Sequence, residues 1–282
     1  MIKTETVLKT NIINNGDVGV LIFCDENSNV QLLERSMIKW VECAVQNYLV
    51  KSIQLQDNKS EFQQIKRNLL KIKYTIVLYS FNPLLTQKNI ELCLDYLVCR
   101  GDKLIKLPFG YVFETDYFKK LSEIKEPVLF SADASEFLKI SDQTQIGYAV
   151  EVLQRRIIQN LIFNNVQLIN PQNIVVNANV VVESGVTIYP FNTLCGETVI
   201  KQNAILKEGN TISNSEIGAN SAIANSIISD STIASNVVIF PFNTIENNSF
   251  IGTNCVVKSY NKINNGYIGD NTTIESFNDI GN

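Results

Sequence analysis

An aliphatic residue recurs at nearly every sixth position from Val176 to the end of the chain. Period six matches neither the 3.6-residue turn of an α-helix nor the plain alternation of a single strand. It is typical of a prism with three flat sides, in which each side contributes one short strand and one inward aliphatic side chain. Nineteen positions keep this phase, too many for chance composition. They are Val176, Val182, Ile188, Leu194, Ile200, Leu206, Ile212, Ile217, Ile223, Ile228, Ile233, Ile239, Ile245, Ile251, Val257, Ile263, Ile268, Ile274 and Ile280.

The corners of such a prism need tight turns, some of them with positive φ. Gly and Asn tolerate that conformation best. Small residues often stand two positions before the next aliphatic, as Val180, Thr198 and Ala204 do. The asparagines expected to serve at corners are Asn177, Asn192, Asn203, Asn220, Asn236, Asn254, Asn264 and Asn271.

Several aromatic residues fall outside the inward phase, and one turn sequence recurs, at Ile188–Thr193 and Ile239–Thr244. We interpret some of these aromatics as a subunit interface. The alternative is that they pack against loops of the prism or against the front domain. The residues are Phe191, Phe240, Phe242, Phe250, Tyr260, Tyr267 and Phe277.

Residues 1 to about 140 alternate between strand-like and helix-like patterns, which predicts a mostly parallel sheet with helices on its faces. The expected strands are Val18–Cys24, Ser52–Leu55, Tyr74–Tyr79 and Leu104–Leu107, the last followed by a turn at Gly110. The expected helices are a stripe of Met37, Trp40, Val41, Ala44 and Leu49, residues 60–71, and Asn89–Cys99 with its end near Gly101. The chain contains neither GxGxxG nor GxxxxGK[ST], so it signals no glycine-rich phosphate-binding loop.

A linker helix is predicted over residues 141–165. Ser141 or Asp142 can cap it, and an apolar stripe follows at steps of three and four from Ile146 to Leu161. Arg155 and Arg156 lie on its flank, and we expect them on a solvated or intersubunit face rather than in an anion site.

The composition excludes several classes of function. The chain has no histidine, which removes the commonest general base and metal ligand. A net charge of −4 gives no drive toward nucleic acid or an anionic membrane, and no apolar run approaches the ~20 residues of a membrane span. The six cysteines form no CxxC pair and fit buried thiols in a reducing cytoplasm rather than a zinc site or a disulfide framework, so we expect a cytoplasmic protein.

Three segments, Gln145–Ile157, Asn165–Pro171 and Val186–Pro190, resemble the bifunctional N-acetylglucosamine-1-phosphate uridyltransferase/glucosamine-1-phosphate acetyltransferase family, GlmU. The match is good over residues 141–282 and weak over 1–140, where this chain is also shorter than the family's domain. The resemblance implies a reduced, Rossmann-like nucleotidyltransferase domain at 1–140, a linker helix at 141–165 and a left-handed parallel β-helix of hexapeptide repeats at 166–282. It also implies a homotrimer formed through the β-helix.

The family's nucleotidyl site needs a glycine-rich loop after the first strand and an Asp that binds magnesium in a Gly-Asp-x-Pro-Leu turn. The first strand here leads into a segment without glycine, and the matching turn reads Ser80–Leu84 with Phe81 at the Asp position. A phenyl ring cannot ligate Mg²⁺. Candidate ligand-binding residues that remain are Asp25, Glu26 and Asn82, and Mg²⁺ is expected only if nucleotidyl transfer survives.

The family's acetyl site uses an Arg, a Lys and a His. The counterparts here are Glu246, Asn264 and Phe277, none of which offers the same chemistry. Beyond residue 156 the chain has four lysines, no arginine and nine acidic residues, a poor match for the phosphates of acetyl-coenzyme A.

The sequence therefore favours a relative that lacks both catalytic activities and binds a sugar nucleotide, regulates, or supports an assembly. Two alternatives stay open. One is an active sugar-phosphate nucleotidyltransferase with a relocated metal site, for which Asp25, Glu26, Asp95 and Asp116 supply carboxylates, and the less favoured one is an acyltransferase. A purely structural repeat is a weaker third reading, because the prism faces are irregular.

Overall fold

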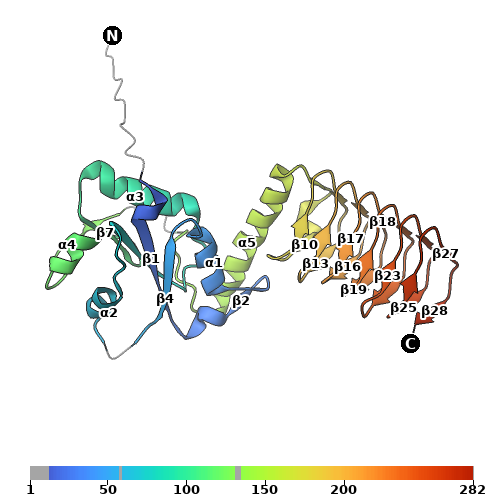
Figure 1. The fold of residues 1–282 in the computed structure, drawn as a ribbon, viewed down its shortest axis with the longest axis horizontal. Coiled ribbons are helices and arrows are strands. Elements are labelled where there is room, and N and C mark those ends of the chain that lie inside the picture. Colours follow the sequence, from blue (N-terminus) through green and yellow to red (C-terminus); the bar gives the residue numbers. More distant parts are fainter. Residues whose placement is uncertain (1–12, 57–58, 131–134, 282) are drawn as a thin grey trace, which may run out of the picture. The chain divides into compact units, whose positions relative to one another are not determined.

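The computed structural model describes residues 13–56, 59–130 and 135–281 (Figure 1). The chain divides into two compact units. The front unit comprises Met1–Leu32 and Ser36–Ala149, and the repeat unit comprises Leu33–Arg35 and Val150–Asn282. Among the described residues, no helix combines the length and the apolar character that crossing a membrane requires.

The front unit contains a six-stranded sheet in the order β4-β1-β5-β7-β6-β8. Strand β1 pairs in parallel with β4 and β5, β6 pairs in parallel with β8, and β7 runs antiparallel to both β5 and β6. The strands are β1 (Val18–Cys24), β4 (Leu49–Gln54), β5 (Tyr74–Tyr79), β6 (Leu104–Lys106), β7 (Tyr111–Glu114) and β8 (Val128–Leu129), and a hairpin pairs β2 (Gln31–Leu32) with β3 (Arg35–Ser36). The helices are α1 (Met37–Ala44), α2 (Glu61–Asn68), α3 (Gln87–Arg100) and α4 (Thr115–Lys120).

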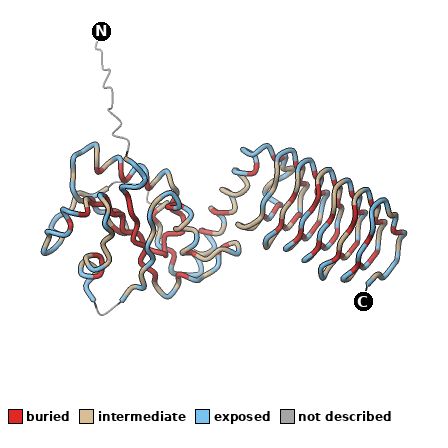
Figure 2. Tube along the Cα trace, viewed as in Figure 1, coloured by how far each residue is buried: buried red, intermediate tan, exposed pale blue. Residues whose placement is uncertain are grey.

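The two central strands are buried along their whole length, which explains why both read as continuous apolar runs (Figure 2). The predicted bounds of β1 and β5 are confirmed. The prediction for Leu49 is wrong. Helix α1 ends at Ala44, and Leu49 begins edge strand β4 with its side chain exposed, so its spacing from the helical stripe is coincidental.

Local capping sets the helix ends as the residue types suggest. Thr86 and Asn89 form a reciprocal capping box at the start of α3, and Gly101 ends that helix with φ 71°. Helix α5 (Gln143–Phe163) begins in the same way, since Asp142 accepts from the Gln145 N–H at 2.9 Å and Gln145 Oε1 accepts from the Asp142 N–H at 3.2 Å. Of the two predicted caps, Asp142 is thus the residue that directly precedes the helix.

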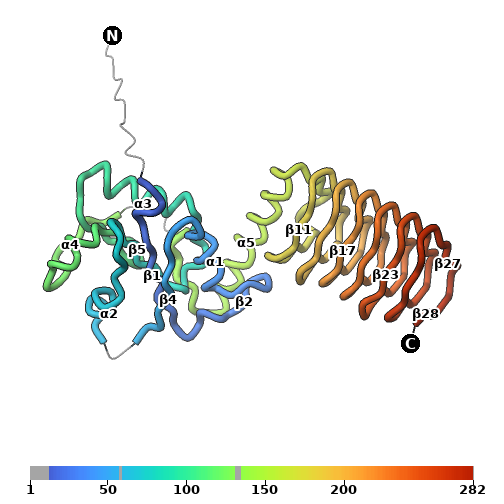
Figure 3. Tube along the Cα trace, viewed as in Figure 1, coloured from blue at the N-terminus to red at the C-terminus, as the bar shows by residue number. Residues whose placement is uncertain are grey.

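The repeat unit is a parallel β-helix whose coils form three flat sheets (Figures 1 and 3). The first sheet contains β10 (Val175–Val176), β13 (Thr193–Cys195), β16 (Thr211–Ser213), β19 (Ile227–Ser229), β22 (Thr244–Glu246), β25 (Lys262–Asn264) and β28 (Asp279–Gly281). The second contains β11 (Val181–Val182), β14 (Val199–Ile200), β17 (Glu216–Ile217), β20 (Thr232–Ile233), β23 (Phe250–Ile251) and β26 (Tyr267–Ile268). The third contains β9 (Gln167–Leu168), β12 (Thr187–Ile188), β15 (Ile205–Leu206), β18 (Ala222–Ile223), β21 (Val238–Ile239), β24 (Val256–Val257) and β27 (Thr273–Ile274).

The six-residue phase predicted from the sequence is confirmed as the inner surface of this prism. From Ile188 to Ile263 every aliphatic in the phase is at most 1% exposed, and each lies level with its counterpart in the next coil, as Ile212 does with Ile228. At the start of the prism, Leu161 of α5 joins the same apolar cluster. The helix therefore covers the inner surface of the first coil. The left hand of the coil stays a prediction from the family resemblance.

The corner prediction is confirmed at five asparagines and wrong at three. Asn203, Asn220, Asn236, Asn254 and Asn271 all adopt φ between 58° and 60°. Neither Asn177 nor Asn264 has positive φ, and the side chain of Asn192 points into the prism instead. Asn192 belongs to a buried polar column that continues, coil by coil, through Asn210, Ser226, Asn243 and Asn261.

Candidate functional site

The carboxyl ends of β1 and β5 meet at one edge of the front sheet, where Asp25 and Ser80 lie together. The Ser80 hydroxyl donates to Asp25 Oδ1 at 3.1 Å and lies 3.0 Å from the hydroxyl of Ser28. The same carboxylate oxygen accepts from the Asn27 N–H at 3.2 Å and caps the 3₁₀ turn Glu26–Asn29. Asp25 Oδ1 is therefore engaged in holding this turn.

The three predicted ligand-binding residues differ in their access to solvent. Asp25 is half-buried and Glu26, the next residue, is exposed. Asn82 is completely buried, and its amide group donates to the carbonyls of Phe137 and Leu138 at 3.0 and 3.1 Å. Asn82 Oδ1 has no hydrogen-bond partner among the described residues. The structure thus brings Asp25 and Glu26 to one surface edge and places Asn82 inside the unit, where it ties two segments together.

Phe81 lies in an aromatic cluster rather than at an open edge. Its ring is buried, stacks on Tyr79 with centroids 4.8 Å apart, and meets Phe109 edge-on at 5.4 Å. The ammonium group of Lys139 lies 5.0 Å from the same ring centroid. The sequence resemblance predicts that this position corresponds to the family's magnesium-binding Asp, and in this structure its ring is part of the apolar core.

The residues of this edge do not fit a magnesium site of the family type. Mg²⁺ demands near-octahedral oxygen coordination, usually with one or two carboxylates. Here the ring of Phe81 stands at the ligand position, and one oxygen of Asp25 is already engaged. Over residues 13–56, 59–130 and 135–281, no three His, Cys, Asp or Glu residues gather closely enough to hold a metal ion.

The three counterparts of the family's acetyl-site residues do not form one site. Glu246 and Asn264 end adjacent strands of the first sheet and lie level with each other. Lys262 Nζ is 4.0 Å from Glu246 Oε1, and Asn264 accepts from Asn247 Nδ2 at 2.9 Å. Phe277 lies at a different corner, before the first sheet, with its ring stacked on Tyr260. The structure therefore brings two of the three together and separates the third by the width of a sheet.

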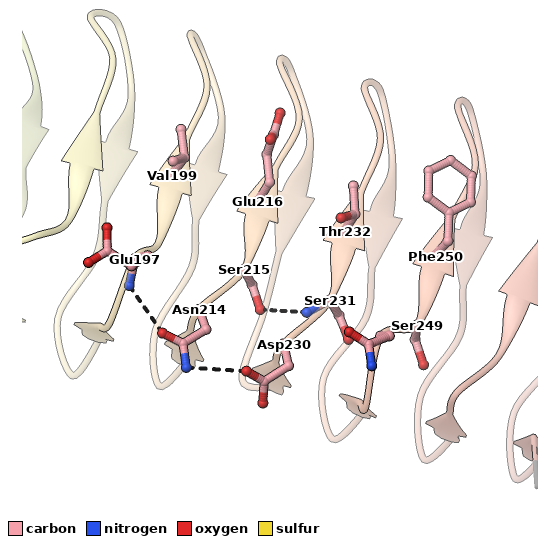
Figure 4. A pocket seen from close by; sticks show the side chains of 11 residues that line it. Glu197, Val199, Asn214, Ser215, Glu216, Asp230, Ser231, Thr232, Ser249 and Phe250 are labelled. Atoms are coloured by element: carbon pink, nitrogen blue, oxygen red, sulfur yellow. Dashed lines mark hydrogen bonds between the residues drawn. The ribbon is translucent and has the colours of Figure 1, made fainter.

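A recess of about 530 Å³ opens where the first sheet turns into the second (Figure 4). Glu197, Glu216 and Asp230 line it together with hydroxyl and amide side chains, and Phe250 stands at one end. The Glu197 N–H donates to Asn214 Oδ1 at 3.1 Å, and Asn214 Nδ2 donates to Asp230 Oδ1 at 3.2 Å. We call this surface the acidic recess.

The acidic recess arises from a change in repeat length. Two successive corners, Ile212–Ile217 and Ile228–Ile233, have one residue fewer than the corners on either side. Both of these five-residue steps are visible in the sequence, and three corners per coil place them at the same corner of successive coils.

The charge of the acidic recess restricts its ligands. Among the described residues that line it there is no lysine or arginine. Lys201, outside the lining, lies 3.8 Å from Glu216 and 3.4 Å from Glu183, so it is already paired. Three carboxylates without a lining cation repel phosphate groups, which disfavours coenzyme A or a nucleotide at this surface.

The cysteines provide a direct test of the fold. No disulfide joins any of the six. Burial raises the pKa of Cys93 to about 12, and Cys93 lies in the apolar core of the front unit, whereas Cys43 and Cys99 are exposed. Since the thiolate is the reactive form, we expect iodoacetamide at pH 8 to modify Cys43 and Cys99 within minutes and Cys93 only after denaturation. Peptide mass spectrometry over time measures this, and early labelling of Cys93 would contradict the packing of α3.

Comparison with known proteins gives one consistent family. No family model matches the chain. Its sequence is 34% identical over 128 residues to the bifunctional protein GlmU of Nostoc sp., 36% over 129 residues to that of Synechococcus elongatus, and 33% over 144 residues to that of Clostridium acetobutylicum. These matches cover 45%, 46% and 51% of this chain and 28%, 28% and 32% of the relatives, so they span about a third of each relative's length or less.

Solved structures resemble the chain only loosely. A 4-diphosphocytidyl-2C-methyl-D-erythritol synthase from Anaerococcus prevotii covers 50% of this chain and all of its own, at 8% identity and a TM-score of 0.41. The acetyltransferase domain of PglB from Neisseria gonorrhoeae covers 93% of both chains, at 9% identity and a TM-score of 0.31. These identities and TM-scores are too low to assign the fold, which is established by the strand pairing of the chain itself. Over roughly half of its length, the chain is a GlmU-like protein.

Proposed function

We propose that this GlmU-like protein belongs to UDP-N-acetylglucosamine metabolism, lacks both catalytic activities of the bifunctional family, and acts by binding, regulation or assembly. The observation that carries the proposal is Phe81. In the family that this chain resembles, an Asp binds magnesium at the matching position, whereas here a buried ring stacks on Tyr79 and meets Phe109 edge-on. Phosphoryl transfer depends on positioning and charge neutralisation, so the loss of the metal ligand removes most of the rate.

The repeat unit supports the same proposal independently. Acetyl transfer in the family that this chain resembles uses a histidine as general base, and this chain has no histidine. The counterparts Glu246 and Asn264 are a carboxylate paired with Lys262 and a neutral amide, and Phe277 lies at another corner. In this proposal both sites lack the catalytic groups of the family. This favours a non-catalytic role over the loss of only one of the two activities.

The ligand proposed for the front unit is a sugar nucleotide such as UDP-N-acetylglucosamine. Asp25 and Glu26 follow the carboxyl end of β1, which pairs in parallel with β5, and open α/β sheets usually bind ligands at this edge. A carboxylate in this place can accept hydrogen bonds from sugar or ribose hydroxyls without a metal ion. The proposal further includes a cytoplasmic location, in line with the absence of disulfides, and a homotrimer formed through the β-helix.

The first experiment measures turnover. With UTP, Mg²⁺ and N-acetylglucosamine-1-phosphate we expect no pyrophosphate above the no-enzyme rate, and with glucosamine-1-phosphate and acetyl-coenzyme A we expect no free coenzyme A. A full GlmU assayed in parallel is the positive control. Turnover above background would reject the proposal, and its loss in the variant Asp25→Asn, Glu26→Gln would establish the alternative of a relocated metal site.

The second experiment measures binding. A ligand present at a hundredfold excess over its Kd stabilises the folded state by about 2.7 kcal/mol, which raises the melting temperature by several degrees. We expect UDP-N-acetylglucosamine to do so and acetyl-coenzyme A not to. The variant Asp25→Asn, Glu26→Gln should lose the shift, while Asp116→Asn, an exposed carboxylate of α4, should keep it. Equal shifts in all three proteins would exclude Asp25 and Glu26 as ligand-binding residues.

A further inference from the structure

The second sheet is hollowed beside the acidic recess as well as within it. A further depression of about 430 Å³ lies towards the third sheet, and both hollows are lined by Glu216 and Thr232. These two residues lie level with each other on β17 and β20. The acidic recess reaches back to Ser231 before the strand, and the depression reaches forward to Ala234 after it. The two hollows therefore meet over Glu216 and Thr232 and form one cleft along β20, which we call the sheet cleft.

The sheet cleft exists because the outward side chain of β20 is short. Thr232 stands between Glu216 of the preceding coil and Phe250 of the following coil (Figure 4). Since coils lie ~4.8 Å apart, the backbones that carry these two walls are roughly 10 Å apart. After the thickness of both side chains is subtracted, the space holds one flat ring but not an α-helix, whose diameter is ~10–12 Å. The floor, residues 230–235, spans no more than about 17 Å, which is long enough for a short chain of such rings.

One wall of the sheet cleft is the ring of Phe250. Tyr267 of the following coil stacks on this ring with centroids 5.2 Å apart and an interplanar angle of 13°. The neighbour of Phe250 on the other side is Thr232, whose side chain is too short to cover a ring. Phe250 is therefore supported from behind and keeps its other side for a ligand. A pyranose fits such a surface, because the C–H groups on one side of the sugar ring pack against an aromatic face.

The polar groups of the sheet cleft match the hydroxyl groups of a sugar. Glu216 and Asp230 are exposed and supply carboxylate oxygens as acceptors. Thr232 and Asn248 are also exposed and offer donors as well as acceptors. Each sugar hydroxyl both donates and accepts, so it can use both kinds of group. An apolar ligand would instead cover these groups without pairing them, at a cost in free energy.

Charge and geometry disfavour other polar ligands. The carboxylates repel phosphate, which argues against a nucleotide or a sugar phosphate. A metal ion needs converging ligands, and within the described part of the chain no three His, Cys, Asp or Glu residues come together to hold one. Asp230 Oδ1 accepts from Asn214 Nδ2 at 3.2 Å, and Glu216 Oε1 lies 3.8 Å from Lys201 Nζ. The negative charge is thus partly compensated, which favours a neutral ligand over a small cation.

We propose that the sheet cleft binds a short neutral oligosaccharide, with one pyranose ring packed on Phe250 and hydroxyl groups bonded to Glu216 and Asp230. This site goes beyond the sugar-nucleotide binding proposed for the front unit. It lies on the second sheet, whereas Glu246 and Asn264, the counterparts of the family's acetyl-site residues, lie on the first.

The test titrates neutral trisaccharides into the full chain by isothermal titration calorimetry. The probes are cellotriose, maltotriose and triacetylchitotriose, and spermidine and Ca²⁺ serve as charged competitors. We expect at least one trisaccharide to bind at concentrations up to about 10 mM, and neither competitor to displace it. Absence of binding by all three, or displacement by spermidine or Ca²⁺, would overturn the proposal.

The variant Phe250→Thr tests the aromatic wall. It places on β23 the residue that β20 already carries at the level position, so the coil should still form. We expect the Kd of the trisaccharide to rise roughly tenfold, as the loss of an aromatic contact implies. The matched control is Phe240→Thr, which removes a ring that is 46% exposed and lies outside the cleft, and it should leave the Kd unchanged. Equal Kd values in the two variants would contradict a site on Phe250.

A second variant covers the case in which Phe250→Thr does not fold. Thr232→Arg extends a long side chain from an exposed position over the floor of the cleft, so trisaccharide binding should be lost. An unchanged Kd in this variant would place the sugar elsewhere and overturn the proposal. The front-unit variant Asp25→Asn, Glu26→Gln should bind the trisaccharide as the unaltered chain does. Failure of the sheet cleft and failure of the front-unit site are therefore separate results.

Discussion

Replacing Phe81 with aspartate is expected to destabilise the front unit by about 4 kcal/mol or more and to restore no magnesium-dependent turnover. Removing a buried phenylalanine ring alone costs about 3–5 kcal/mol, and a charge buried in its place adds a desolvation cost. The stacking on Tyr79 and the edge contact with Phe109 would both be lost. Lys139, 5.0 Å from the ring centroid, offsets part of that cost by pairing with the new carboxylate.

The single tryptophan makes this measurement specific to the front unit. Trp40 lies in α1, and its indole N–H donates to the Leu32 carbonyl at 3.0 Å, so its fluorescence during urea unfolding reports on that unit. The control is Phe81→Leu, which keeps an apolar side chain and should lose less than half as much stability. A folded Phe81→Asp chain that uses UTP in a magnesium-dependent way would show that only one residue separates this edge from an active site.

The repeat unit could be predicted from the sequence because its determinants are local and periodic. Each inward aliphatic such as Ile212 recurs at a fixed spacing, and the parallel pairing of coils follows once that spacing is known. The burial of Ile188 through Ile263 is the direct consequence. The central strands of the front unit were predictable for a related reason, since a strand buried on both faces reads as a continuous apolar run.

Features that depend on contacts between distant residues could not be predicted. Leu49 fits a helical spacing, yet pairing of β4 with β1 makes it an edge-strand residue. Asn82 comes soon after the end of a strand, as ligand-binding residues often do. Its amide group, however, donates to the carbonyls of Phe137 and Leu138. In both cases a residue more than 25 positions away decides the outcome.

At the corners, the residue type alone did not reveal which way a side chain points. Asn192 and Asn203 look equivalent in the sequence, but one is buried and the other has φ of 58° at the surface. An Asn that follows the positive-φ residue turns inward and bonds back to its own turn, whereas an Asn in the positive-φ position turns outward. The sequence singled out Phe242 and Tyr260 as outward-facing aromatics but not their positive φ, because aromatic residues rarely adopt that conformation.

The buried polar column gives the second large prediction, in which Asn210→Ala lowers the stability of the repeat unit by about 3–5 kcal/mol. Asn210 is fully buried in a central coil. Its amide donates to Asn192 Oδ1 at 2.9 Å and to the Lys207 carbonyl at 2.7 Å, and its Oδ1 accepts from the Ser226 N–H at 3.0 Å. Alanine would leave the Ser226 N–H and one oxygen of Asn192 buried without these partners, at about 1–3 kcal/mol each, and would open a small cavity.

The matched control for this prediction is Asn264→Ala, in the same prism but at its surface. Asn264 takes part in one exposed hydrogen bond, from Asn247 Nδ2 at 2.9 Å, so its loss should cost less than about 1 kcal/mol. Far-UV circular dichroism during urea unfolding follows the β-helix, while Trp40 fluorescence should not change in either variant. If Asn210→Ala and Asn264→Ala unfold at the same urea concentration, the polar column does not hold the coils together. If the column stabilises the turns, replacing a buried member must cost more stability than replacing an asparagine at the surface.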